Sequence, residues 1–429
     1  MIEVRKEIRF GTMAFDWQGR IDFARLKKDR LQKTQAKMKE LGIAALIVAR
    51  GENKRYATGV RSAVHTGPGE SFGLVFAESP DIIVYEEGVV WGAEKEHITW
   101  IKPENLRPIS MTMGGAAGPA YVEEYAKNVF AAPIYRDLKE RGVEKEKLGA
   151  DFIIGPCKAA LENLGVKVVD CFNMMTEVRS TKLDDEINCM KMAGAIVEIA
   201  YAEMIEAMRP GMRENEICAI GQAALWKNGV EGVGGVTVRS GPNTMPPYIG
   251  RMPTDRIIQP GNLVYTDVFG VAYMGYRTCY YRTFKVGTRP TEQEKEWFKK
   301  TREYLYNALN EIRDGVTTAE VAEKWPLASE FGLTSEAVAA AYNFGHGIGL
   351  AQYEYPCISR DFSLKFPQVI KKGMTIAVEC SAGEVNPKQG VRGACRLENV
   401  YAVTEKGCEC LYALPDDQIL IPPHGIYTL

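Results

Sequence analysis

Apolar residues at helical spacing open the first regular part of the chain. From Phe23 to Leu41 they recur every three or four positions, and the pattern stops at Gly42, which predicts an amphipathic helix. The apolar run IAALIVA then predicts a buried strand, the polar ENKRYATG a loop, and FGLVF and DIIVYEE two further strands. Strands and helices alternate up to about Cys171. This order predicts a small α/β domain over residues 23–174.

The pattern changes at VRSTKLDDEI, which we interpret as the start of a second domain, residues 175–429. A long helix is predicted from Asp184 to Met208, because a Pro-Gly pair follows and cannot continue it. A second helix is predicted from about Glu214 to Asn228, again before a glycine.

Two capping boxes indicate where further helices begin. Thr291 with Glu294, and Thr317 with Glu320, have the spacing at which a side chain and a backbone N–H satisfy each other. The helix after Thr291 is predicted to run to near Gly315.

An internal repeat connects these helices. RPGMRENEI (Arg209–Ile217) and RDGVTTAEV (Arg313–Val321) share Arg-x-Gly and then Glu-aliphatic at the same spacing, and each follows a long helix and precedes a β-rich region. We interpret this as a duplicated α+β half-domain with a site between the halves. The alternative is that Arg-x-Gly only marks the end of a helix.

Composition and charge narrow the class of protein. The chain has 429 residues, of which 46% are hydrophobic and 25% charged, with a formal net charge of −2. The Lys and Arg residues are dispersed, so no nucleic-acid partner is expected. No apolar run reaches the length of a membrane span and the N-terminus is unlike a signal peptide. We therefore expect a cytoplasmic protein of two domains with no membrane partner.

The cysteines and the N-terminal arm suggest no further chemistry. The ten cysteines lie between Cys157 and Cys410 without CxxC pairs, which favours reduced, buried thiols over disulfides. Residues 1–22 form an arm that carries Phe10, Phe15 and Trp17. Aromatic side chains are rarely left in water, so we expect the arm to pack on something, and a partner subunit is one option.

The candidate chemistry centres on His346, which lies in the glycine-rich run GHGIG. Glycines let the backbone approach a neighbour closely and present the ring. Three carboxylates, Asp267, Glu379 and Glu398, lie in or beside predicted strands. One histidine and three carboxylates can converge on a divalent metal ion. Any one of these carboxylates alone is more often structural.

Several blocks of sequence resemble a known family. KELGIAALIVARGENKRYATG resembles the start of a creatinase-type N-terminal domain, and VRSTKLDDEINCMKMAGAI the entry to the catalytic domain. TDVFGVAYMGYRTCYYRTF, GHGIGL, MTIAVE and RLENVYAVTEKG follow in the family's order. The chain is thereby identified as a member of the pita-bread fold family of creatinase, prolidase, aminopeptidase P and methionine aminopeptidase. The stretch SGPNTMPPYIGRMPTDRIIQPGN makes it nearest in pattern to the dimethylsulfoniopropionate lyase-like branch.

The resemblance implies a fold and a set of metal ligands. The fold is α+β: a pita-bread C-terminal domain with duplicated α+β halves, preceded by a smaller α/β creatinase-type N-terminal domain. The family's ligands fall on Asp267, His346, Glu379 and Glu398, and a fifth, usually an aspartate, falls on Cys279. A thiolate there would favour a softer ion such as Zn²⁺ or Fe²⁺ over Mn²⁺.

We expect one divalent ion of zinc, iron or manganese, rather than the two that bridging carboxylates hold in the peptidases. The alternative is a metal-free site in which Cys279 only fills space, as the resemblance to creatinase allows.

Three departures from the family bear on the reaction. Two histidines that its peptidases use to steady the tetrahedral intermediate and to transfer protons fall near Pro247 and Tyr248, and on Tyr353. Their absence argues against efficient peptide cleavage. In the lyase branch a catalytic aspartate follows GHGIGL, where this chain has Gln352. An amide cannot abstract a proton, so the same lyase mechanism is not expected.

The blocks around the site contain side chains suited to a zwitterionic substrate. Aromatic faces beside carboxylates bind quaternary ammonium or sulfonium cations, and arginines can clamp a carboxylate. The substrate-binding candidates are Arg61, His65, Tyr248, Arg251 and Tyr276. Taken singly, each is more simply a surface or core residue.

The sequence leads to one principal hypothesis and two alternatives. The principal one is a dimeric enzyme that cleaves a C–N, C–S or amide bond in a small zwitterionic metabolite. A metal would polarise substrate or water, with Tyr353, Tyr281 and Glu379 as catalytic residues. The alternatives are a metal-dependent Xaa-Pro dipeptidase or aminopeptidase, and a small-molecule binding protein without catalysis.

Overall fold

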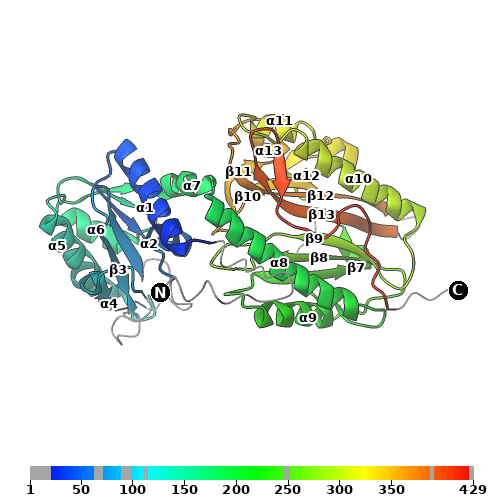
Figure 1. Ribbon diagram of the computed structural model, residues 1–429, viewed down its shortest axis with the longest axis horizontal. Helices are drawn as coiled ribbons and strands as arrows, with labels where there is room; N and C mark the ends of the chain where they lie inside the picture. Colours follow the sequence, from blue (N-terminus) through cyan, green and yellow to red (C-terminus); the bar gives the residue numbers. More distant parts are fainter. Residues whose placement is uncertain are drawn as a thin grey trace. The chain divides into compact units, whose positions relative to one another are not determined.

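The computed structural model describes residues 21–61, 71–87, 98–110, 112, 115–245, 252–386 and 391–424. The chain divides into two compact units, Asp22–Arg179 and a second unit that begins at Ser180 and includes Ile21. The boundary lies at the end of helix α7 (Phe172–Ser180), as Figure 1 shows. Of the expected N-terminal arm, residues 1–22, the structure describes the last two residues alone.

The N-terminal unit is built on a mixed sheet with the strand order β4-β3-β2-β1-β5-β6. Its strands are β1 (Ala45–Val48), β2 (Phe72–Phe76), β3 (Ile82–Glu86), β4 (Leu106–Pro108), β5 (Lys147–Ala150) and β6 (Lys167–Asp170). Its helices are α1 (Phe23–Glu40), α2 (Gly51–Thr58), η4 (Pro103–Asn105), α4 (Pro119–Glu124), η6 (Tyr125–Ala131), α5 (Ala132–Glu140), α6 (Gly155–Asn163) and α7. The small α/β domain expected from the alternating pattern is confirmed.

One local prediction in this unit is wrong. The polar stretch ENKRYATG forms helix α2 rather than a loop, and ends at Gly59 with a left-handed φ of +76°. The reason lies in Lys54, whose side chain is fully buried and binds both Ser71 and Glu86. A buried polar residue whose ion-pair partner is distant in the sequence cannot be told from a loop residue by the local sequence pattern.

Asp151 connects the sheet to the start of α2. Its carboxylate accepts hydrogen bonds from the backbone N–H of Ala49 (2.7 Å) and from Asn53 Nδ2 (2.7 Å). Burial raises the pKa of Asp151 from 3.8 to about 6, although these donors oppose the shift. The cost of burying the charge therefore outweighs the hydrogen bonds that favour it.

This raised pKa predicts how the stability of the N-terminal unit depends on pH. Because the folded-state pKa of Asp151 lies above its usual value, its contribution to the free energy of unfolding is fully present below about pH 4. It is lost as the pH rises through 6, at about 1.4 kcal/mol for each pKa unit. Asp151→Asn should remove this slope, which urea unfolding between pH 4 and 7 would measure. An unchanged slope in the variant would contradict the assignment.

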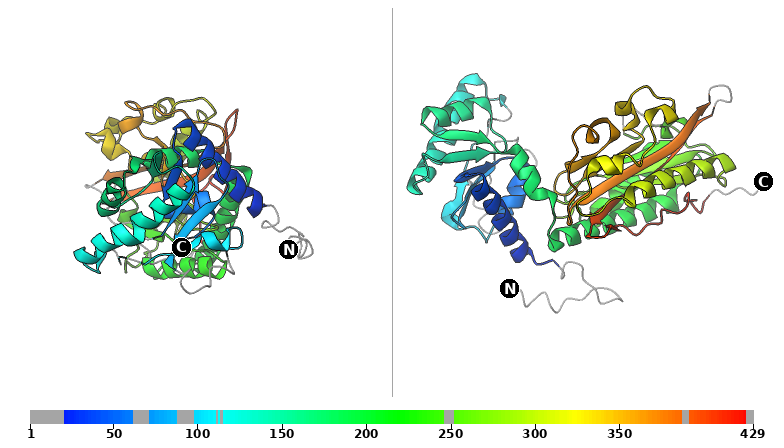
Figure 2. Two further views of the ribbon diagram at one scale, coloured as in Figure 1. Left: turned by 90° about the vertical axis from the view of Figure 1, so that its left-hand side faces the viewer. Right: turned by 90° about the horizontal axis from the view of Figure 1, so that it is seen from above.

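The C-terminal unit contains two sheets with helices packed on them (Figures 1 and 2). Its strands are β7 (Gly235–Ser240), β8 (Leu263–Phe269), β9 (Tyr281–Lys285), β10 (Asn343–Gly347), β11 (Glu354–Ile358), β12 (Thr375–Asn386), β13 (Val391–Val403) and β14 (Cys408–Cys410). Its helices are α8 (Asp184–Ala207), α9 (Glu214–Lys227), η7 (Gly241–Thr244), α10 (Glu292–Leu309), α11 (Thr318–Ala322), η8 (Ala328–Phe331), α12 (Glu336–Ala339) and α13 (Arg360–Ser363). The sheet orders are β7-β8-β9 and β11-β10-β12-β13-β14.

The two sheets meet where β9 lies beside β13, so that the smaller sheet continues the larger one. Helix α9 packs on β7, and α10 packs on β12 and β13, the long strands coloured orange in Figure 2. The second half buries a core that includes Trp297, Leu305 and Ile376. The α+β pita-bread arrangement is confirmed.

The predicted duplication appears in matching backbone hydrogen bonds. Gly211 N–H donates to the Ile258 carbonyl, and Gly315 N–H donates in the same way to that of Ile370. Both glycines have a left-handed φ, +91° and +86°. Each turn is followed by a capped helix start, where Glu216 and Glu320 bind the backbone N–H of the N-cap residue. The repeat is therefore structural in both halves.

Helix α10 ends earlier than the sequence predicts. Its capping box at Thr291 and Glu294 is present, but the helix stops at Leu309 and not near Gly315. The apolar spacing misleads here, because Ile312 and Val316 still pack into the same core from a turn.

All ten cysteines lie in the described part of the chain and none forms a disulfide there. Most are buried, as expected, but Cys357 and Cys408 are half-buried and Cys410 is exposed. Among the described helices, none combines the length and apolar character needed to cross a membrane.

Candidate metal centre

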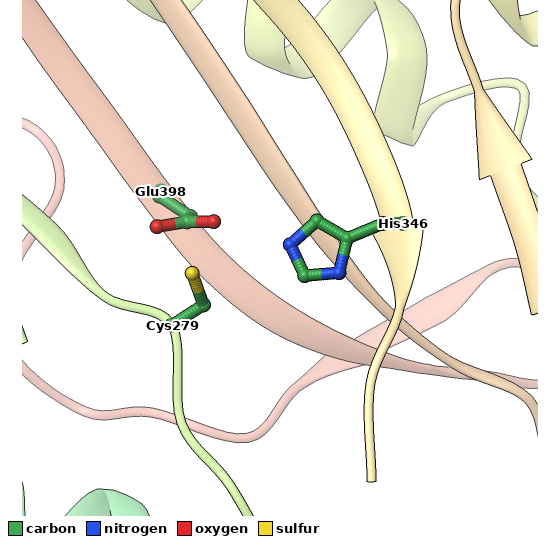
Figure 3. A group of neighbouring side chains, drawn as sticks. All are labelled: Cys279, His346 and Glu398. Carbon is green, nitrogen blue, oxygen red and sulfur yellow. The ribbon is translucent and has the colours of Figure 1, made fainter. Parts of the chain in front are cut away.

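Three potential metal ligands meet in the C-terminal unit, near the join of its two sheets. One ligand atom each from Cys279, His346 and Glu398 lies within 4.8 Å of the other two, and all three residues are buried. Figure 3 shows the imidazole of His346 and the thiol of Cys279 directed toward the Glu398 carboxylate. These residues come from β10, from the segment before β9, and from β13, so the fold brings together distant parts of the sequence.

The glycines around His346 allow β11 to approach closely. A Cβ atom at Gly347 would lie 2.4 Å from the Tyr355 carbonyl oxygen, and one at Gly349 would lie 2.8 Å from Glu354 Oε2. The register between β10 and β11 also shifts after His346, and such irregularities often re-aim a side chain next to a functional site. The GHGIG run therefore holds the histidine where the ring faces Cys279 and Glu398.

The hydrogen bond of His346 indicates which ring nitrogen carries the proton. Its Nδ1 lies 2.9 Å from the carbonyl oxygen of Gly347. Because a carbonyl oxygen only accepts, Nδ1 carries the proton and Nε2 keeps a lone pair. Metal-binding histidines are commonly oriented by such a bond on their second nitrogen.

Glu398 and two further carboxylates share one face of the strands. Glu398 lies opposite Glu379 in the β12–β13 pair, and Asp267 lies opposite Tyr281 in the β8–β9 pair. Residues opposite one another in antiparallel strands point to the same side. Asp267 and Glu398 are buried, and Glu379 is half-buried. We call the side that carries these four residues the site face.

The duplication relates positions of the site face to one another. Gly261 and Gly373 each have a left-handed φ. The N–H of Gly261 donates to the Val286 carbonyl, and the N–H of Gly373 donates to the Val403 carbonyl, so these two hydrogen bonds correspond in the two halves. Counting from these bonds along the paired strands gives the equivalent positions Asp267 with Glu379, Tyr281 with Glu398, Cys279 with Arg396, and Arg239 with His346. The candidate ligands thus occupy repeated positions of the two halves.

Burial and neighbouring carboxylates together raise the pKa values of two groups of the site. Burial raises the pKa of Cys279 well above its usual range, and the carboxylates of Glu398, Asp267 and Glu379 raise it further. The pKa of Tyr281 is raised for the same two reasons, with Glu379 the largest of the carboxylate effects. A divalent cation among these groups would reverse this, since it stabilises the thiolate.

The donor set fits a divalent metal ion. A thiol, an imidazole and a carboxylate, all buried and with one ligand atom each within 4.8 Å of the others, are the donor types that Zn²⁺ and Fe²⁺ accept. Asp267 and Glu379 lie close enough to act on Cys279, but they are not part of that tight group.

Tyr412 holds the segment that carries Cys279. Its ring stacks on that of Tyr280, with the centroids 4.2 Å apart, and its hydroxyl interacts with the Cys279 backbone amide. On the other side, Gly194 of α8 leaves room for the ring, since a Cβ there would lie 2.4 Å from Tyr412 Cδ1. Helix α8 and the C-terminal segment therefore fix the position of one candidate ligand.

Gly194→Ala is predicted to displace this tyrosine. Overpacking costs about 1–3 kcal/mol, which exceeds the gain of about 1 kcal/mol from replacing a glycine within a helix. The variant should unfold at lower denaturant concentration and bind a metal ion more weakly than wild type, as measured by denaturation and equilibrium dialysis. Gly407→Ala is the matched control, because a Cβ at Gly407 meets nothing within 4 Å. Unchanged stability and metal affinity in Gly194→Ala would contradict this role of Tyr412.

The other predicted site residues are found in different surroundings. The ring of Tyr353 lies 4.6 Å from that of His346 and is 56% exposed. Tyr281 is buried on the site face. Tyr276 is buried, and its hydroxyl donates to Glu186 of α8 over 2.6 Å, so this hydroxyl is engaged inside the protein. Arg61 is exposed in the N-terminal unit.

Three predicted substrate-binding residues, His65, Tyr248 and Arg251, lie outside the described residues. Two residues that the structure brings to the site were not predicted from the sequence, Tyr412 and Arg396. For Arg396 a signal did exist, because it lies two positions before Glu398 and therefore on the same side of a strand.

The fold and this donor set define a class of protein: a fold of two repeated α+β halves that carries a buried group of candidate metal ligands. Comparison of the sequence with known protein families leads to the same class. The chain belongs to metallopeptidase family M24, whose model matches residues 188–405, and the Creatinase/Prolidase N-terminal domain matches residues 30–181. Members of family M24 depend on divalent metal ions. The resemblance found in the sequence is thereby confirmed.

Relatives with curated names include hydrolases and a lyase. A probable dipeptidase PepE of Mycobacterium tuberculosis is 30% identical over 260 residues, 60% of this chain and 65% of that protein. The dimethylsulfoniopropionate lyase DddP of Roseovarius nubinhibens is 25% identical over 309 residues, 70% of this chain and 66% of that protein. The chain thus spans less than two thirds of the length of either.

Solved structures share the fold. The X-Pro aminopeptidase from Thermotoga maritima superposes with a TM-score of 0.69, covering 91% of this chain and 99% of that chain at 21% identity. At this identity the likeness establishes the fold alone.

Proposed function

We propose that the protein is a metal-assisted hydrolase or lyase that cleaves a C–N, C–S or amide bond in a small zwitterionic metabolite. The observation that carries this proposal is the convergence of Cys279, His346 and Glu398 at the centre of the duplicated fold. One divalent ion held by these three residues would polarise a bound water or substrate oxygen. The thiolate favours zinc or iron over manganese.

The remaining groups of the site face would bind and transfer protons. Glu379 is half-buried and lies opposite Glu398, which suits a carboxylate that accepts a proton near the ion. Tyr353, exposed beside His346, would exchange a proton with the solvent-facing side of the substrate. Tyr281 would donate a hydrogen bond from the opposite sheet.

The proton-transfer groups favour a non-peptide substrate. The second histidine expected of a peptidase in this family is replaced by Tyr353, which lies against His346. Of the two histidines in the described residues, the other, His424, pairs with Glu206 at 3.0 Å. The side-chain amide of Gln352 donates to the Thr278 carbonyl (3.3 Å), so this residue supports the loop next to Cys279 rather than acting as a base.

A substrate cation would meet Tyr353 rather than the inner tyrosines. The rings of Tyr265 and Tyr281 already face a guanidinium, that of Arg396, at 4.6 and 5.8 Å. The Tyr353 ring is exposed and lies next to a site rich in carboxylates, which is favourable for a quaternary ammonium or sulfonium group.

A second candidate function is an Xaa-Pro dipeptidase or other dipeptidase. It is favoured by the 30% identity to a protein named as a probable dipeptidase.

The test is a substrate panel on protein loaded with zinc or iron(II), with products detected by mass spectrometry. The panel contains glycine betaine, dimethylsulfoniopropionate and Xaa-Pro dipeptides, with His346→Gln as the inactive control. Turnover of a zwitterion that the control lacks supports the proposal. Turnover of the dipeptides alone would contradict it, and binding of a zwitterion without turnover would indicate a binding protein.

A further inference from the structure

Arg396 occupies a position on the site face that neither the metal ligands nor the proposed acid–base groups use. It lies in β13 two residues before Glu398, so both side chains leave the strand on the same side. Its backbone is held on both sides by Thr283, whose hydroxyl accepts from the Arg396 N–H and donates to the Arg396 carbonyl, each at 2.8 Å. Arg396 is therefore fixed where the two sheets join.

The guanidinium of Arg396 is buried, and among the described residues no anion lies beside it. The residue is 9% exposed, and its Nε has no hydrogen-bond partner among these residues. In the described part of the chain its guanidinium contacts the faces of Tyr265 and Tyr281 and forms no ion pair within 4.0 Å. A buried guanidinium that keeps unpaired N–H donors is costly.

Two nearby arginines show what a structural arginine looks like in this protein. The Arg282 guanidinium donates to the carbonyls of Pro415 and Glu398 and to Asn399 Oδ1. Arg239 lies 3.5 Å from Glu214. Both are more buried than Arg396, at 1% and 2% exposed against 9%, and both have an oxygen partner. Among the described residues the Arg396 guanidinium has no such oxygen partner and contacts two aromatic rings instead.

The duplication gives an independent reason to place Arg396 at the site. Its equivalent in the first half is Cys279, a candidate metal ligand. The first half of the fold thus has a candidate metal ligand, Cys279, at this position, and the second half has the positively charged Arg396 at the equivalent position.

We infer that Arg396 binds the carboxylate of the substrate and orients it toward the metal centre. This inference rests on the proposed function and adds the substrate group that is recognised. A guanidinium pairs with a carboxylate through two parallel hydrogen bonds. The two strand positions from Arg396 to Glu398 span about 7 Å, which suits a small molecule whose carboxylate lies a few bonds from the bond that is cleaved. A phosphate dianion carries twice the negative charge of a carboxylate, so Asp267, Glu379 and Glu398 repel it more strongly.

The experiment measures how small anions stabilise the protein against thermal unfolding. Acetate, glycine betaine and inorganic phosphate are compared with chloride at equal ionic strength, in wild type, Arg396→Met and Arg396→Lys. The matched control is Arg302→Met, which removes a guanidinium that lies 4.6 Å from the Tyr306 ring, outside the site. Every variant is measured both metal-free and loaded with zinc.

We expect acetate and glycine betaine to raise the midpoint of wild type and of Arg302→Met above the value in chloride. Apparent affinity should fall at least about tenfold in Arg396→Met, and Arg396→Lys should recover part of it, because an ammonium cannot form the paired bonds. If the Arg396-dependent shift persists in metal-free protein and zinc does not bind, the inference stands and the proposed function fails.

Three results would overturn the inference. Carboxylates could stabilise wild type and Arg396→Met equally, or stabilise neither more than chloride. Phosphate could also replace carboxylate as the anion that depends on Arg396. In the first two cases Arg396 would only offset the negative charge of the site's own carboxylates.

Discussion

His346→Gln is expected to weaken the binding of a zinc ion by more than about 100-fold and to abolish turnover. The ring supplies one of three buried candidate ligand atoms, and its Nδ1 is hydrogen-bonded to the Gly347 carbonyl. Loss of a residue that merely orients a metal ligand costs about 10–100-fold in affinity, so loss of the ligand itself should cost more. Equilibrium dialysis with zinc measures the effect.

The chain offers a matched control for this change. His424→Gln removes a half-exposed histidine that pairs with Glu206 in the same unit. It should leave zinc affinity unchanged. Equal zinc affinity in wild type and His346→Gln would show that the ion, if bound, is held elsewhere.

Lys182→Met is expected to cost about 3–5 kcal/mol of stability in the C-terminal unit. Lys182 and Glu354 form an ion pair of 2.8 Å in which the side chains are 1% and 0% exposed. Removing the cation leaves the buried Glu354 carboxylate without its ion-pair partner. Since Glu354 also accepts from the Ala351 N–H (3.0 Å) and abuts Gly349, the loop after His346 should loosen too. Denaturant unfolding measures the loss.

Two variants separate this effect from a general loss of charge. Adding Glu354→Gln to Lys182→Met should restore part of the stability, because the buried charge is then gone. Lys372→Met breaks a solvent-exposed pair with Glu405 and should change stability little. Similar losses in Lys182→Met and Lys372→Met would refute the role of the buried pair.

Much of the fold could be predicted because its signals are local. The helix α1 before Gly42, the capping boxes at Thr291 and Thr317, and the Arg-x-Gly repeat all depend on neighbouring residues, and each was found where the sequence indicated. Helix α2 was missed because its Lys54 is paired with Glu86, a residue of strand β3 that is remote in the sequence. Long-range pairing of this kind leaves no periodic trace in a single sequence.

Only those parts of the candidate site that follow from residue type and position in a strand could be predicted from the sequence. His346 and Glu398 stood out by their motifs and Cys279 by the family resemblance, and the structure brings these three together. Tyr276 was expected to face a substrate, but strand alternation alone could not show that its hydroxyl binds Glu186. Arg396 and Tyr412 were missed, because their importance depends on the join between the sheets and on a glycine in α8.

The most direct test of the central claim, that Cys279, His346 and Glu398 hold one divalent metal ion, is titration of the metal-free protein with cobalt(II). Absorption in the near ultraviolet reports a thiolate bound to cobalt, and the visible bands report the coordination number. We predict that wild type binds one equivalent with a thiolate-to-cobalt band, and that Cys279→Ser loses this band. A wild-type titration without the band, or a band that persists in Cys279→Ser, would contradict the assignment of Cys279 as a ligand.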